Sequence, residues 1–233
     1  MLHVLHGRMP VAFPAGVYYR NGPDLSGSWL AHPLDGQGRV DRLEFAGGGG
    51  GVRLVSRRVQ TPDGGRHCFG TGPQRGMALH HPANTSVMHH AGRLMALWEG
   101  GRPVELDPHS LRTLQQEVPL AGATAGLPST SGWPALDQLV GAGGQAVSAH
   151  PVLDPITGRM VVLTSQITPR SVRYRISELA PKSLAVERRR TFDVPGFSHV
   201  HGGMLITRDM YSRPRSRWRR HPTSWVVARW GRA

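Results

Sequence analysis

The sequence predicts an all-β protein, and three observations support this. Glycine and proline are abundant, at 30 and 19 of 233 residues, and a chain with many tight turns uses them where a helical protein does not tolerate them. Short strand-like stretches recur between turn sequences, and no stretch has a sustained helical period. Residues 105–113 and 152–160 both repeat the order strand, Asp-Pro turn, strand. These features favour a β-propeller, although a β-sandwich would give similar turns.

The individual strands follow from local patterns. The best candidates are residues 16–20, 39–45, 52–61, 93–99, 159–164, 171–177 and 185–194. In one of them, Val172, Tyr174 and Ile176 alternate with arginines, which predicts one buried face and one wet face. The segments AGGGGG and HAGR predict hairpins, because glycine readily adopts a positive φ. Residues 121–144 lack periodicity and predict a long loop.

The charge is strongly positive, with 28 basic and 15 acidic residues and a net charge of +13. Such a balance usually indicates an anionic partner. Seven of the arginines, however, lie within the last 21 residues, and the only lysine is Lys182. This distribution indicates a GC-rich coding sequence, so we expect no nucleic-acid partner. A protein that binds nucleic acid through its arginine-rich C-terminal residues stays an alternative. The single cysteine, Cys68, excludes an internal disulfide and a cysteine-based zinc site.

Histidine is the residue type that suggests chemistry, because the chain has thirteen. The pairs at 80–81 and 89–90 are adjacent, and neighbours on a strand face opposite sides, so neither pair easily shares one ion. His199 and His201 are better spaced for a common face. From spacing alone, a hydrogen-bonded or exposed histidine remains the more frequent case. Hydrolase, nucleotide and dinucleotide motifs are absent from the sequence.

Five blocks, in this order, resemble the carotenoid cleavage oxygenases, a family that includes apocarotenoid-cleaving and stilbene-cleaving enzymes. They are GVYYRNGP (16–23), HPLDGQGRV (32–40), residues 83–113, VSAHPVLDPITGR (147–159) and FSHVHGGMLITRD (197–209). The resemblance implies a seven-bladed β-propeller that holds one non-haem Fe(II) through four histidines. By motif, His150 matches the first ligand and His201 the second, with His199 a structural neighbour.

The same resemblance selects Glu99 as an acid that accepts the ring N–H of a ligand histidine, which would fix the imidazole tautomer. A solvated carboxylate at the end of a strand is the alternative for Glu99. The implied reaction is the oxidative cleavage of a carbon–carbon double bond, with an apolar polyene and O₂ as partners. Peripheral membrane contact for substrate uptake is left open. Because no signal peptide or membrane-spanning run is present, we expect a cytoplasmic protein, without excluding a plastid.

The sequence departs from the family pattern in length and at its end. The family's chain is roughly twice as long, so the third and fourth histidines have no counterpart here, and Gly202 stands where the second histidine motif has aspartate. We therefore expect a partial propeller over residues 1–211, with half of the iron ligands absent. For residues 212–233 we expect an unstructured basic tail, as an out-of-frame extension or a gene-model error would give.

These departures leave two readings of the activity. One is a dioxygenase of this family that is truncated and inactive, or that gathers four histidines by pairing two chains. The alternative is a non-catalytic partial propeller that binds an apolar ligand or a protein partner.

Overall fold

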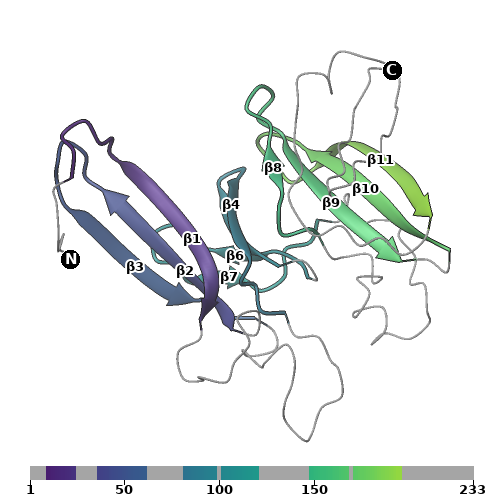
Figure 1. The fold of residues 1–233 in the computed structure, drawn as a ribbon, viewed down its shortest axis with the longest axis horizontal. Coiled ribbons are helices and arrows are strands. Elements are labelled where there is room, and N and C mark those ends of the chain that lie inside the picture. The colour runs from purple at the N-terminus through teal and green to yellow at the C-terminus, as the bar shows by residue number, and fades with distance from the viewer. Residues whose placement is uncertain are drawn as a thin grey trace, which may run out of the picture. The chain divides into compact units, whose positions relative to one another are not determined.

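The computed structural model describes residues 9–24, 36–61, 81–98, 101–120, 147–167 and 170–195, and these residues contain eleven strands and no helix (Figure 1). The all-β prediction is therefore confirmed for the described residues. The chain divides into two compact units, Met1–Pro119 and Leu120–Ala233. Unit 1 contains two antiparallel sheets, and unit 2 contains a third.

The first sheet has the order β1-β2-β3. Its strands are β1 (Gly16–Asp24), β2 (Gln37–Phe45) and β3 (Val52–Arg58). The AGGGGG segment makes the turn between β2 and β3, as predicted, and Gly47, Gly48 and Gly49 all have positive φ. Tyr18 pairs with Leu43, which in turn pairs with Leu54, so these three apolar side chains share one face of the sheet.

The second sheet has the order β4-β5-β6-β7. Its strands are β4 (Ser86–His90), β5 (Arg93–Leu97), β6 (Val104–Leu106) and β7 (Thr113–Gln115). The HAGR sequence forms the β4–β5 turn as predicted, with Ala91 at φ 53° and Gly92 at φ 76°. A two-residue turn with both φ values positive matches the twist of the strands that it joins.

The core of unit 1 is shared by both of its sheets. Its fully buried members come from β2, β5, β6 and the segments between strands: Val40, Val59, Ala83, Leu94, Ala96, Val104, Leu106 and Leu111. Tyr19 of β1 and Val55 of β3 pack against this cluster from the first sheet. Because the alternate residues Tyr18 and Leu54 are 56% and 40% exposed, the first sheet has one core face and one open face.

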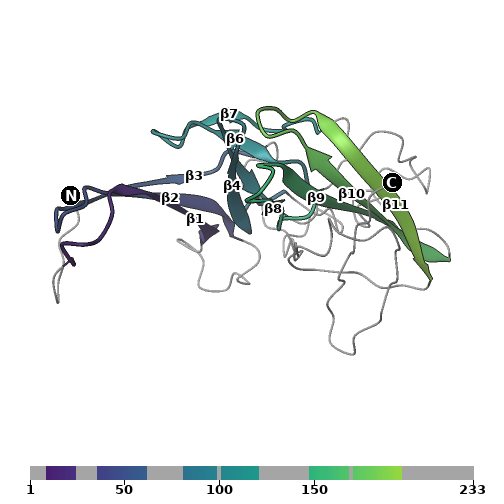
Figure 2. The same ribbon diagram turned by 90° about the horizontal axis from the view of Figure 1, so that it is seen from above.

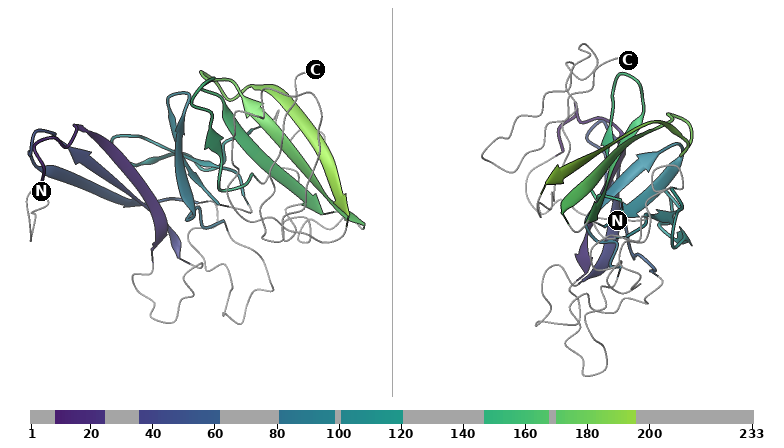
Figure 3. Two further views of the ribbon diagram at one scale, coloured as in Figure 1. Left: turned by 45° about the horizontal axis from the view of Figure 1, so that its top comes forward. Right: turned by 90° about the vertical axis from the view of Figure 1, so that its right-hand side faces the viewer.

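The third sheet has the order β11-β10-β9-β8, and β9, β10 and β11 lie side by side in Figures 2 and 3. Its strands are β8 (Val152–Leu153), β9 (Met160–Ile167), β10 (Ser171–Leu179) and β11 (Val186–Pro195). Val172, Tyr174 and Ile176 are buried as predicted, and Tyr174 stacks on its cross-strand partner Phe192 with ring centroids 5.6 Å apart.

The prediction of a wet face opposite this core is wrong at Arg175. Arg175 is only 8% exposed, and Ser177 on the same face is fully buried. Burial lowers the pKa of the Arg175 guanidinium, and the nearby positive charges of Arg189 and Arg173 lower it further. The alternation of residue types predicted the correct strand period, but the polarity of Arg175 did not predict its exposure; its Nε–H donates to Thr191 Oγ1 at 3.3 Å.

The two Asp-Pro segments form the same turn. Asp107 N–H donates to the Arg112 carbonyl and Leu111 N–H to the Asp107 carbonyl, each at 2.8 Å. Asp154 repeats both bonds at 2.8 Å with Arg159 and Gly158. The aspartate carboxylates cap the turns, since Ser110 N–H lies 2.6 Å from Asp107 Oδ1 and Ile156 N–H lies 3.0 Å from Asp154 Oδ1. The internal repeat predicted from sequence is thus confirmed as a repeated hairpin turn.

The long loop predicted for 121–144 and the tail predicted for 212–233 lie outside the described residues. The division into a body over 1–211 and a tail over 212–233 therefore stays a prediction. No helix of the described segments has the length and apolar character needed to cross a membrane.

Candidate functional site

His150 lies in a backbone segment that is anchored to the third sheet. Val147 and Ala149 are buried, at 1% and 0% exposure, and Ser148 N–H donates to the Leu163 carbonyl of β9 at 2.8 Å. The His150 N–H in turn donates to the Ser148 hydroxyl at 3.2 Å. The His150 side chain itself is partly exposed. The small residues before His150 therefore let the backbone pack closely beside β9, next to the edge strand of the sheet.

The edge of the sheet is irregular at His150. Val152 pairs with Val161, whereas Ser148 bonds to Leu163, so residues 149–151 stand opposite Val162 alone. Residues 149–151 are not part of a strand, so the ladder between β8 and β9 ends at Val152, and the Ser148 bond continues the contact with β9 beyond it. Pro151 fits this position because it has no N–H to offer to the ladder. His150 therefore lies in the segment that leads into the edge strand β8.

The other two predicted site residues, His201 and Glu99, lie outside the described residues. Within the described ranges, no group of three or more His, Cys, Asp or Glu side chains is placed to hold a metal ion. Of the two predicted ligand histidines, only His150 lies in the described part of the chain, and one imidazole alone does not make an iron site. The ligand assignments of His150 and His201, and the orienting role of Glu99, stay predictions.

The histidines that the sequence set aside behave as expected where they are described. On β4, His89 is exposed and its neighbour His90 is buried, so they face opposite sides and do not form a pair of ligands. His81 packs its ring against Trp98, with centroids 5.7 Å apart, and its Nε2 contacts the Arg102 carbonyl. The rings of His81 and Trp98 therefore pack against each other.

Asn21, in the RNGP sequence of β1, has a structural role that the sequence analysis missed. Its side-chain amide donates to the carbonyls of Ala83 and Ser86, each at 2.8 Å, and so ties β1 to the start of β4. Asn84 makes a reciprocal bond to the Gly36 carbonyl at 2.8 Å. An asparagine inside a strand is unfavourable on propensity alone, and that disagreement was the available signal. Two amides thus join the sheets of unit 1.

A buried acid lies close to the hairpin that follows His150. Glu178 on β10 is 5% exposed, and burial raises the pKa of its carboxyl, with the negative charge of Asp154 adding to that effect. The positive charges of Arg188 and Arg159 oppose it. Arg159 Nε lies 3.9 Å from Glu178 Oε2 and also contacts Glu187. The turn after the candidate ligand is therefore surrounded by coupled charges.

The fold defines an all-β protein built of successive antiparallel sheets, with His150 beside the edge strand of the third sheet. The family model described as retinal pigment epithelial membrane protein, RPE65, matches residues 1–210. The chain therefore belongs to the RPE65/carotenoid cleavage oxygenase family, which confirms the resemblance found in the sequence.

Two relatives show the degree of similarity. The apocarotenoid-15,15'-oxygenase of Synechocystis sp. is 33% identical over 213 residues, covering 80% of this chain and 39% of that protein. The chloroplastic carotenoid cleavage dioxygenase 7 of Oryza sativa subsp. japonica is 31% identical over 247 residues, covering 86% of this chain and 40% of that protein. The chain thus spans 39% and 40% of the length of these relatives.

Solved structures agree with the sequence match. Cobalt-substituted Synechocystis ACO superposes with a TM-score of 0.65 at 31% identity, over 87% of this chain and 43% of that chain. The lignostilbene dioxygenase of Pseudomonas brassicacearum gives a TM-score of 0.65 at 26% identity, over 87% of this chain and 41% of that chain. The three antiparallel sheets therefore correspond to part of the fold of this family.

Proposed function

We propose that this chain is part of a non-haem Fe(II)-dependent dioxygenase that cleaves a carbon–carbon double bond of an apocarotenoid or a related polyene. The observation that carries the proposal is the 33% identity to the Synechocystis apocarotenoid-15,15'-oxygenase over 213 residues. The reaction balances without a further reductant, because one alkene and one O₂ give two carbonyl products. In this proposal each sheet is a blade, or part of a blade, of a propeller.

The proposed iron ligands are His150 and His201, with Glu99 accepting a ring N–H from a ligand histidine. The anchored backbone around His150 supports its part in this set: Ser148 bonds to β9, and its hydroxyl accepts from the His150 N–H. Imidazole nitrogen is a donor that suits Fe(II), and neutral ligands leave the charge of the ion undiminished. When bound, the ion supplies the redox chemistry with O₂. The role of His150 is to hold the ion at the sheet edge.

Iron content tests the assignment independently of activity. The 233-residue chain is loaded with Fe(II) without oxygen and desalted, and the iron per chain is then measured. We expect retained iron in the unchanged chain and loss of most of it in His150→Ala. His89→Ala is the matched control, because it removes an exposed imidazole from β4, and it keeps its iron. Equal iron in both variants, or none in the unchanged chain, would refute the assignment.

The open face of the first sheet favours a second candidate function, a non-catalytic partial propeller that binds an apolar ligand or a protein partner. Tyr18, Leu43 and Leu54 form an apolar row across that face, and Tyr18 and Leu54 are 56% and 40% exposed. Iron separates the two functions. Iron that depends on His150 supports the oxygenase, whereas an iron-free chain that binds a hydrophobic fluorescent probe, and loses that binding in Tyr18→Ser, supports the scaffold.

A further inference from the structure

Unit 1 contains a groove that neither proposed function uses. It has a volume of about 800 Å³, within the range of small-molecule sites. It lies between the end of β3 and the segment around β7, the two edge strands of their sheets. Its lining residues are Gln37, Arg57, Arg58, Val59, Gln60, Thr61, Arg112, Thr113 and Gln116. All of them belong to the described part of unit 1, so the groove is defined within a single compact unit.

Hydrogen bonds between the two edges hold the walls of the groove in place. Gln60 N–H donates to Thr113 Oγ1 at 3.0 Å, which joins the end of β3 to β7. Val59 N–H donates to the Gly38 carbonyl at 2.7 Å, and the Gln37 side-chain amide donates to the Val59 carbonyl. Val59 is fully buried and belongs to the core of unit 1. The groove is therefore preformed, and a ligand would not have to order its walls.

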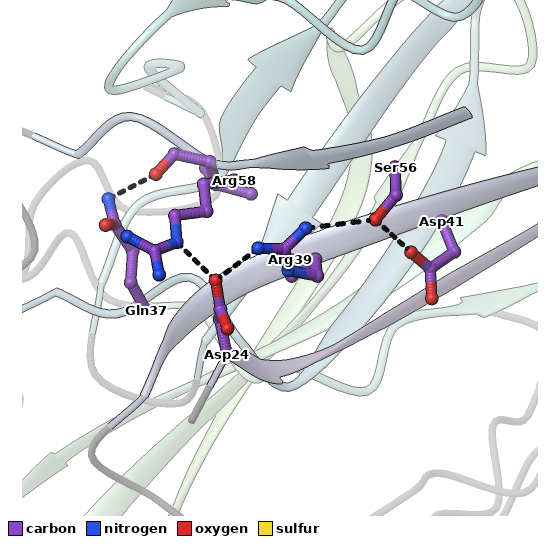
Figure 4. Close-up of polar contacts among 7 residues, drawn as sticks. Asp24, Gln37, Arg39, Asp41, Ser56 and Arg58 are labelled. Carbon is purple, nitrogen blue, oxygen red and sulfur yellow. Dashed lines mark hydrogen bonds and ion pairs between the residues drawn. The ribbon is translucent and has the colours of Figure 1, made fainter. Parts of the chain in front are cut away.

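The lining is cationic. It includes three arginines and no acidic residue. Arg58 contacts the Asp24 carboxylate, which also accepts from Arg39 at 2.7 Å (Figure 4). Arg57 and Arg112 have no ion-pair partner among the described residues. Two of the three guanidinium groups thus add uncompensated positive charge to one groove.

Thr61 gives an independent sign of a missing partner. Its side chain is 3% exposed, and among the described residues its hydroxyl has no hydrogen-bond partner. A buried hydroxyl without a partner destabilises the fold, so native proteins usually satisfy it. Thr61 is one of the residues that line the groove, so a ligand there would lie next to this residue. The amides of Gln60 and Gln116 add further donors to the same lining.

We propose that this groove binds a small organic anion that carries more than one phosphate or carboxylate group. Guanidinium groups form paired, charge-assisted hydrogen bonds with both kinds of oxyanion. An anion with a single charged group would engage one arginine, whereas the groove offers several on opposite walls, Arg57 on β3 and Arg112 next to β7. The buried Thr61 hydroxyl then donates to the same ligand. None of the proposed iron ligands is among the residues that line the groove, so a failure of this proposal would leave the proposed oxygenase function untouched.

Calorimetric titration of the 233-residue chain with pyrophosphate, and separately with citrate, at 150 mM NaCl tests the proposal. We expect saturable binding of at least one probe, and the stronger probe identifies phosphate or carboxylate as the preferred group. In the double variant Arg57→Gln/Arg112→Gln the dissociation constant should rise at least tenfold. The matched control is Arg20→Gln/Arg53→Gln, which removes the same charge from exposed positions of β1 and β3 outside the groove, and it should change the constant less than twofold.

Thr61→Val separates a ligand contact from general electrostatics. It removes the hydroxyl with little change of shape, so the unliganded protein should unfold at the same or a higher temperature, while the probe binds severalfold more weakly. Equal weakening in both double variants would show that the net charge alone attracts the probes, and would overturn the proposal. Absence of saturable binding with both probes would overturn it as well.

Discussion

Gly38 of β2 lies against the backbone carbonyl of Ala83, so closely that a Cβ at position 38 would stand 2.1 Å from that oxygen. The Gly38 N–H donates to the Pro82 carbonyl at 2.7 Å, and Ala83 itself has a positive φ of 47°. Glycine is therefore required at position 38 because a side chain would clash with the Ala83 backbone, and not because of the backbone φ angle. The two sheets of unit 1 meet at this contact.

Replacement of Gly38 tests this close approach. Gly38→Ala should destabilise the protein by about 3 kcal/mol, because backbone atoms must move to admit the methyl group. The control is Gly16→Ala in β1, where a Cβ meets nothing within 4 Å and the change should be small. Denaturant unfolding measures both variants. Equal stability of the two variants would contradict the contact.

The β4–β5 turn offers a stabilising change. Ala91 has a φ of 53°, a conformation in which an alanine is strained and an asparagine is tolerated. Ala91→Asn should therefore raise the unfolding free energy by about 0.5–1 kcal/mol. Gly92→Ala, at φ 76°, should lower it. Thermal unfolding should show a higher melting temperature for Ala91→Asn and a lower one for Gly92→Ala. A lower melting temperature for Ala91→Asn would contradict the turn geometry.

The two Asp-Pro turns differ at one equivalent position, where Leu111 has φ 58° and Gly158 has φ 70°. A Cβ at Gly158 would meet Pro181 at an ordinary 3.4 Å, so space permits a side chain there and only the backbone conformation resists it. Gly158→Ala should therefore cost about 1 kcal/mol, well below the cost at Gly38. Chemical denaturation compares the two alanine variants, and a cost at Gly158 equal to that at Gly38 would show that contacts dominate at both.

Glu178 predicts a pH dependence. Burial raises the pKa of its carboxyl above the ordinary value of 4.5, so the unfolded chain loses this proton at a lower pH than the folded chain does. Ionised Glu178 therefore lowers the unfolding free energy. The loss is complete at a pH above the raised pKa, and it is absent at a pH well below 4.5. Glu178→Gln should melt at a higher temperature than the unchanged chain near pH 8, and at the same temperature near pH 3.

Melting curves across this pH range measure the difference, with Glu117→Gln, at an exposed position of unit 1, as the control. A Glu178→Gln variant that melts lower than the unchanged chain at pH 8 would show that Arg159 and Arg188 outweigh burial.

The sequence predicted most of the strands, but it missed β4. The pattern of Val172, Tyr174 and Ile176 identified β10 because a long strand repeats its period several times. β4 was missed because its sequence SVMHH repeats no apolar period, although it is as long as the predicted β5. The exposure of Arg175 could not be read from its charge, because what covers a sheet face is decided by segments distant in sequence.

The candidate site was predicted from a family resemblance rather than from residue spacing. His150 proved to be anchored beside β9, although its spacing from other histidines carried no information. The Asn21 bonds and the cationic groove were not predicted, because both join segments that are far apart in the chain. Arg57 and Arg112 look like ordinary surface arginines until the fold brings the ends of β3 and β7 together.

The amide bridge from Asn21 to Ala83 spans 62 positions of the chain. During synthesis on a ribosome, Asn21 of β1 cannot form this hydrogen bond until Ala83 has emerged. Contacts between residues so far apart in sequence also form slowly. Synthesis interrupted before position 83 would thus leave a lone sheet with its inner apolar surface uncovered, a species that chaperones or proteases recognise.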